Sequence, residues 1–136
     1  MKENIQSFRD LRIWQDGISL TKEIYRLTAK FPNREIYGLT SQLRRASVSI
    51  PSNIAEGHIR KTTTEFKYFL YIALGSLAEL ETQIIISYQL QMVSENDRQN
   101  LINRIEILGK QIRSLITKLK TKPQSPTPKP ISKRGV

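Results

Sequence analysis

The sequence of 136 residues contains no cysteine and only one histidine, His58. Without cysteine the chain can form neither a disulfide framework nor a thiolate zinc site. A helical di-iron centre requires repeated Glu-x-x-His motifs on inward faces, and Glu56 stands two residues from His58 instead of three. No Ser-His-Asp set has usable spacing, and no glycine-rich phosphate loop is present. We therefore expect no metal, no cofactor and no enzymatic activity.

Long hydrophobic runs are also missing. No stretch approaches about 18 uninterrupted apolar residues, so we expect no transmembrane helix. The opening residues, Met-Lys-Glu-Asn-Ile-Gln, lack the apolar run of a signal peptide. Together with the missing cysteines, these absences predict a cytoplasmic protein without a membrane partner.

Acidic residues are scarce. The chain has 22 basic and 12 acidic residues, a formal net charge of +10. Six basic and no acidic residues lie from Lys118 onward, which leaves 16 basic and 12 acidic residues in the rest. A basic chain attracts polyanions at long range, although lysines also simply keep a small bundle soluble.

Residues 121–136 differ in composition from the rest of the chain. They contain four of the six prolines, among lysine, serine and threonine. Such a segment cannot bury a core, which predicts a disordered basic tail. The tail is either a flexible arm that scans polyanions or a solvated terminus without a partner.

Four segments with helical periodicity precede this tail. We expect helices over about 8–30, 39–57, 63–91 and from Ser94 to about 120, with Thr62 or Thr63 and Ser94 as N-caps. Gly57 is predicted as a C-cap glycine. Short loops between amphipathic helices predict an all-α, antiparallel up-down-up-down four-helix bundle over residues 8–120, after a flexible N-terminus at 1–7.

Two of these helices carry more than one apolar stripe. The first helix has one stripe through Ile13, Leu20, Ile24, Leu27 and Phe31, and a second through Leu11, Trp14, Ile18 and Tyr25. The third helix has a second stripe that contains Tyr71, Leu74, Ala78 and Ile85, beside a main stripe of Phe66, Phe69, Leu70, Ala73, Leu77, Leu80, Ile84 and Tyr88. The fourth helix has one stripe, made of Leu101, Ile105, Leu108, Ile112, Leu115 and Leu119, with Ile116 beside it. A helix needs only one apolar stripe to pack into the core of its own bundle. The second stripes therefore predict contact between copies of the chain. Trp14 is either a core filler or an interface anchor. The candidate interface residues are Trp14, Ile18, Tyr25, Tyr71 and Leu74.

The second helix carries a proline at its centre. Pro51 cannot donate to the carbonyl of Ser47, which predicts a kink with nearby serines bonding the freed groups. Asn53 and Glu56 lie one turn apart just after it, where they either read a ligand or satisfy local polar groups. In the third helix, Gly75 predicts close approach of another backbone, or else a tolerated exposed glycine.

The best functional candidates are cationic: Arg44, Arg45, Arg60, Lys61 and Lys67. Arginine binds phosphate in a fork geometry, and several copies of the chain would multiply such contacts. Tyr68 and Tyr71 could add stacking to a single strand. The alternative is that Arg44 and Arg45 form ion pairs, within or between subunits, with Glu56, Glu79 or Glu81.

Three stretches carry a family resemblance: Phe8-Arg9-Asp10-Leu11-Arg12-Ile13-Trp14-Gln15, residues 39–57 ending in Ser-Ile-Pro-Ser-Asn-Ile-Ala-Glu-Gly, and Phe69–Ala73 with Gly75–Thr82. They resemble the bacterial four-helix-bundle proteins encoded by intervening sequences of large-subunit ribosomal RNA genes. That family is similar to the accessory variability determinant protein of diversity-generating retroelements. The resemblance covers about residues 8–118.

The resemblance implies an all-helical bundle, usually a ring-shaped homopentamer, without established enzymatic activity. In the retroelement relatives the basic ring binds nucleic acid and docks a reverse transcriptase. Our first hypothesis is a homo-oligomer, pentameric by resemblance, that binds RNA or DNA with little sequence preference. The alternative is a protein-interaction adaptor, docking for example a reverse-transcriptase-like partner, with no nucleic-acid binding of its own.

Overall fold

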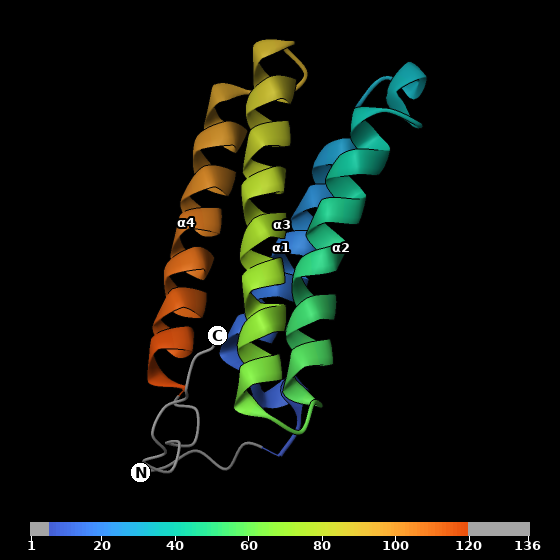
Figure 1. The fold of residues 1–136 in the computed structure, drawn as a ribbon. Coiled ribbons are helices and arrows are strands. Elements are labelled where there is room, and N and C mark those ends of the chain that lie inside the picture. The colour runs from blue at the N-terminus through green and yellow to red at the C-terminus, as the bar shows by residue number, and fades with distance from the viewer. Residues whose placement is uncertain (1–5, 120–136) are drawn as a thin grey trace, which may run out of the picture.

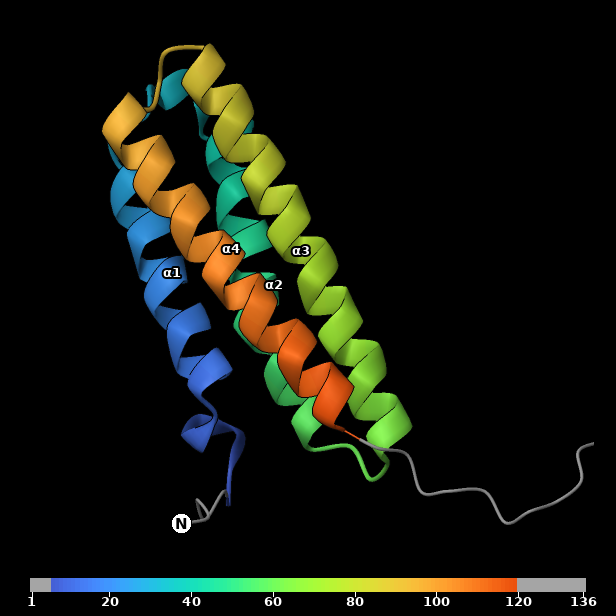
Figure 2. The same cartoon turned by 90° about the vertical axis from the view of Figure 1, so that its left-hand side faces the viewer.

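The chain folds into four long helices packed side by side (Figure 1). The computed structural model describes residues 6–119. Its helices are α1 (Arg12–Thr28), α2 (Leu39–His58), α3 (Thr63–Gln89) and α4 (Glu95–Lys118), with 3-10 turns at Phe8–Asp10 and Asn33–Glu35. Each helix packs against its neighbours in the sequence, and α1 also contacts α4 (Figures 1 and 2). The predicted all-α four-helix bundle is confirmed, while the tail at 121–136 lies outside the described residues.

The predicted N-caps are confirmed by their hydrogen bonds. Ser94 Oγ accepts from the Asp97 amide at 3.1 Å, and Thr62 Oγ1 accepts from the Glu65 amide at 3.1 Å. Each bond satisfies one of the amides that a helix leaves unpaired at its start. Ser7, which the sequence analysis places in the flexible N-terminus, caps the 3-10 turn at Phe8–Asp10.

The core lies along the predicted main stripes. The apolar members of the first stripe of α1 are all buried, and the main stripes of α3 and α4 supply most of the rest. On α4, Ile116 is buried while Leu115 and Leu119 are only partly buried, so the inward face is rotated slightly from the predicted one. This placement follows from the periodicity of about 3.6 residues per turn.

Gly57 is not a C-cap, contrary to prediction. It lies inside α2, which continues to His58, and within residues 6–119 no glycine has a positive φ. A Cβ at this position would meet the Cβ of Phe69 at 2.7 Å. The glycine is therefore needed because α2 and α3 approach closely here, not because the helix ends in a left-handed residue.

Gly75 shows the opposite situation. It is exposed on α3, and a Cβ built there meets nothing within 4 Å. Within the subunit, the prediction that another backbone approaches Gly75 closely is therefore wrong. The alternative prediction, that this glycine is exposed and tolerated, is correct.

The backbone around Pro51 is completed by α1. Proline at position 51 has no amide hydrogen to donate to the Ser47 carbonyl. This carbonyl accepts from Thr21 Oγ1 at 3.0 Å, a hydroxyl that it shares with the Gly17 carbonyl at 2.9 Å. Gly17 faces Pro51 across this contact, and a Cβ there would just touch the proline, 3.4 Å from its Cβ. Ser47 Oγ instead donates to the Arg44 carbonyl, at 2.9 Å. Helix α2 continues without interruption through Pro51. The kink at this residue stays a prediction.

Helix α3 is apolar on more than its buried face. By length and composition alone it would suit a membrane span, a property that it shares with core helices of soluble bundles. Its packing against α2 and α4 gives it the role of a bundle helix. Even so, Tyr68, Tyr71 and Ile86 remain exposed on its outer side.

Candidate nucleic-acid interface

Arg44 is held in place by α1. Its Nε donates to the hydroxyl of Thr28 at 2.8 Å, and its guanidinium carbon lies 4.5 Å from the centroid of the Tyr25 ring. Thr28 is buried and donates in turn to the Ile24 carbonyl, at 2.8 Å. The guanidinium is therefore positioned before any ligand arrives, which reduces the side-chain entropy that binding would cost.

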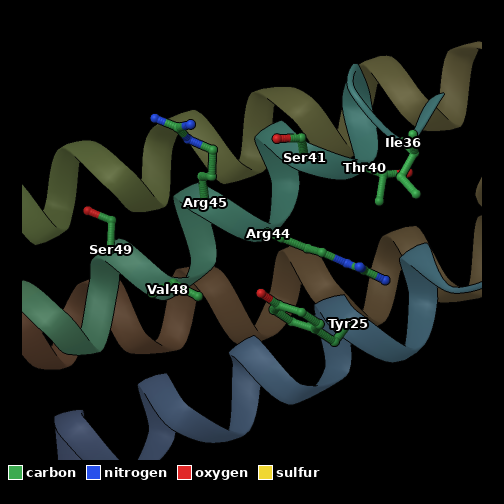
Figure 3. Close-up of a pocket in the computed structure, with 8 residues that line it drawn as sticks. All are labelled: Tyr25, Ile36, Thr40, Ser41, Arg44, Arg45, Val48 and Ser49. Atoms are coloured by element: carbon green, nitrogen blue, oxygen red, sulfur yellow. The ribbon is translucent and has the colours of Figure 1, made fainter.

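An open depression of about 520 Å³ surrounds this arginine (Figure 3). It is lined by Tyr25, Ile36, Thr40, Ser41, Arg44, Arg45, Val48 and Ser49. Figure 3 shows Arg44 extending over Tyr25, while Arg45 points away from it. The lining combines two cations, three hydroxyl side chains, an aromatic ring and aliphatic walls, and it contains no carboxylate. Such a surface suits an anion that also carries a flat apolar group.

Within the described residues, neither arginine is paired with a glutamate. Four ion pairs join side chains within residues 6–119, and none of them includes Arg44 or Arg45. Glu56, one predicted partner, instead pairs with Arg60 at 2.6 Å. The alternative of ion pairs within the subunit is therefore wrong, and pairs between subunits stay a prediction.

The structure separates the predicted basic residues into two places. Arg44 and Arg45 lie in the first half of α2, whereas Arg60 and Lys61 follow its end. Lys67 lies in the second turn of α3. The 16 positions between Arg44 and Arg60 correspond to roughly 24 Å along a helix. Arg60 is also engaged, because it pairs with Glu56 and lies 4.9 Å from the centroid of the Phe69 ring. The cationic candidates therefore do not form one patch.

The predicted oligomer interface is partly exposed. Trp14, Ile18 and Leu74 are half-buried, and Trp14 packs against the core of its own subunit with its ring centroid 5.5 Å from that of Phe8. Tyr25 and Tyr71 are 43% and 60% exposed. Trp14 therefore contributes to the fold, while Tyr71 remains open to a partner.

The polar residues after Pro51 serve the fold. Asn53 Nδ2 donates to the carbonyl of Ser49 at 2.8 Å and to its Oγ at 2.9 Å. Ser49 Oγ also lies 2.8 Å from Ser76 Oγ, across the contact between α2 and α3. For Asn53 this confirms the interpretation that it satisfies local polar groups, and Glu56 forms its ion pair with Arg60.

The groups whose pKa values shift lie where the end of α3 meets the start of α4. A hydrogen bond from Arg98, at 2.7 Å, and a second from Tyr88 lower the pKa of Glu95. The hydrogen bond to Glu95 raises the pKa of Tyr88. This exposed cluster involves none of the residues that line the depression beside Arg44.

Sequence reasoning missed two residues that shape the depression and its surroundings. Thr28 positions Arg44, and Thr21 supports the helix that carries it. Both hydroxyls bond residues of α2 from α1. In the sequence, each is simply a threonine four residues after a small or apolar residue of the same helix. This pattern is common in helices and does not indicate a partner on another helix.

The fold and the site define the class of this protein: an antiparallel four-helix bundle with an arginine-lined depression on its second helix. The chain belongs to the family described as 23S rRNA-intervening sequence protein, whose model matches residues 9–114. This confirms the resemblance to proteins encoded within large-subunit ribosomal RNA genes, whereas similarity to the retroelement protein stays a prediction.

A solved structure supports the fold. The chain is similar to a crystal structure of a protein with unknown function from the S23 ribosomal protein family of Bacteroides thetaiotaomicron. The TM-score is 0.69 and the identity 19%, over 76% of this chain and 97% of that chain. At this identity the likeness shows the fold alone. No curated protein matches the chain.

Proposed function

We propose that the chain is a non-enzymatic, cytoplasmic bundle protein that assembles with copies of itself and binds RNA with little sequence specificity. The observation that carries the proposal is the depression beside α2, which is lined by half-buried Arg44 and exposed Arg45 and contains no carboxylate. Because Thr28 and Tyr25 already position Arg44, this arginine can bind phosphate at a small entropic cost. The family, encoded within ribosomal RNA genes by its description, makes RNA the first polyanion to test.

The outer side of α3 supports assembly. Tyr68 and Tyr71 are 62% and 60% exposed, and Ile86 is also exposed further along the helix. Covering apolar surface stabilises a complex by about 25 cal/mol per Å² before the costs of association. The proposed stoichiometry, a pentamer, comes from the family resemblance. A ring would repeat the basic surface around its circumference and raise the avidity for a long polyanion.

A salt titration tests the binding to RNA. The affinity of the full chain for a generic RNA should fall steeply between low and moderate salt, because each neutralised phosphate releases counterions. Arg44→Glu with Arg45→Glu should weaken binding by at least about tenfold. Lys110→Glu with Arg113→Glu, on the exposed side of α4, is the matched control for the same change in net charge.

Two results would overturn the proposal. If the affinity for RNA does not depend on salt, the binding does not rest on contacts between the cations and the phosphates. If reversing the charges of Arg44 and Arg45 leaves the affinity for RNA unchanged, this surface does not contact RNA. That result would favour the hypothesis of a protein-interaction adaptor.

A further inference from the structure

We propose that the depression beside Arg44 is a pocket for one unpaired nucleotide of single-stranded RNA. The base would lie against the pair formed by Tyr25 and Arg44, and the phosphate would contact Arg45. This inference rests on the proposed function, which itself requires only a general attraction for RNA. It adds a preference for single strands and assigns different roles to the two neighbouring arginines.

The pair of Tyr25 and Arg44 has the chemistry of a base platform. The guanidinium carbon lies 4.5 Å from the ring centroid, so a planar cation and an aromatic ring are adjacent at the edge of the depression. Unpaired bases stack on aromatic rings and on arginine planes in RNA-binding proteins. Nε of Arg44 donates to the Thr28 hydroxyl, which fixes the arginine side chain. Within residues 6–119, no ion pair neutralises the charge of Arg44.

The dimensions and lining of the depression suit a nucleotide. Its volume of about 520 Å³ is within the range of about 300–1,000 Å³ for pockets that hold small ligands. Ile36 and Val48 supply apolar walls, and Thr40 and Ser41 supply hydroxyl groups for the edges of a base. With two arginines and no carboxylate, the lining complements the charge of a phosphodiester.

A duplex could not use this pocket in the same way. Its bases are stacked on each other and paired, so only its phosphates and the edges of its grooves reach the protein. The surface outside the pocket would attract both forms of RNA through charge alone. A single strand can add the stacking of one base, and this difference makes the inference testable.

The experiment compares binding of a short unstructured RNA strand with binding of its duplex, for the full chain and for charge-conserving variants. Arg44→Lys and Tyr25→Leu each remove part of the platform and should weaken single-strand binding by about tenfold, with little effect on the duplex. Arg113→Lys is the matched control, because it conserves the charge on the exposed side of α4, outside the depression. This control should change the single-strand affinity by no more than about twofold.

A fluorescent base reports stacking directly. A strand that contains 2-aminopurine should change its emission on binding to the unaltered chain, and Arg44→Lys should abolish this change under saturating conditions. Thermal melting of each variant establishes that it is folded. Tyr25 is 43% exposed and does not belong to the buried core.

Either of two outcomes would overturn the inference while leaving the proposed function intact. The first is equal binding of strand and duplex by the unaltered chain. The second is full retention of single-strand binding by Arg44→Lys. Loss of assembly in Tyr25→Leu without a selective loss of single-strand binding would show that another copy fills the pocket. By contrast, failure to bind either RNA in a salt-dependent manner would overturn the proposed function itself.

Discussion

The two sides of α3 differ in how they are packed. On the inner side, Gly57 of α2 lies so close to α3 that a methyl group would meet the Cβ of Phe69 at 2.7 Å. On the outer side, Gly75 is exposed and a methyl group would meet nothing within 4 Å. Yet apolar residues occupy both sides, since Tyr68 and Tyr71 are exposed on the outer one. The inner side is therefore committed to folding, whereas the outer side has apolar character that folding of one chain does not use.

The largest expected effect is at the crowded side. Gly57→Ala inserts a methyl group between α2 and the Cβ of Phe69, so the free energy of unfolding should fall by about 1–3 kcal/mol. Urea denaturation followed by circular dichroism measures the change. An unchanged or higher stability would show that the two helices can separate without cost, which contradicts the close packing described above.

The support of α2 by α1 gives the next largest effect. Thr21→Val leaves the Ser47 carbonyl without its hydroxyl donor and should lower the free energy of unfolding by about 1–2 kcal/mol. In a Pro51→Ala background the amide at position 51 can bond that carbonyl, so the same substitution should cost less. A double-mutant cycle measures this coupling. Purely additive effects would contradict the role assigned to Thr21.

A smaller effect of opposite sign is expected at the open side. Gly75→Ala should raise the free energy of unfolding by about 0.5–1 kcal/mol, because alanine loses less backbone entropy in a helix and meets no neighbour. The measurement is made at a concentration low enough for single chains. A loss of stability there would mean that the outer side of α3 is packed within the subunit after all.

The smallest effect concerns the first turn of α4. The Glu95 pKa should be lower than its ordinary value, and Arg98→Ala should raise it by removing the main hydrogen bond. Because the folded pKa is depressed, the contribution to stability is present above the unfolded pKa and is lost as the pH falls through the folded pKa. Carboxyl chemical shifts measured during a pH titration test this, and an unshifted Glu95 would contradict it.

The sequence was sufficient for the helices and most of the core because these depend on local patterns. The stripe through Ile13, Leu20 and Ile24 and the caps at Thr62 and Ser94 are set by residues within a few positions of each other. These features were predicted correctly without knowledge of how the helices pack.

Features that depend on contacts between helices were not predictable in the same way. Gly57 follows an apolar helix and so resembles a C-cap, but its role comes from Phe69 in the next helix. Likewise, the orientation of Arg44 depends on Thr28, 16 residues earlier. Periodicity indicates which face of a helix is buried, but it does not indicate which hydroxyl on another helix completes a hydrogen bond.

Assembly, as proposed above, requires that another copy of the chain cover the outer side of α3. Sedimentation equilibrium of the full chain at moderate salt tests this most directly, with Tyr71→Glu as a variant that places a charge on the exposed face. The account predicts a particle of several chains, five under the proposed stoichiometry, which Tyr71→Glu dissociates into folded single chains. A mass of one chain for the unaltered protein, across the whole concentration range, would contradict it.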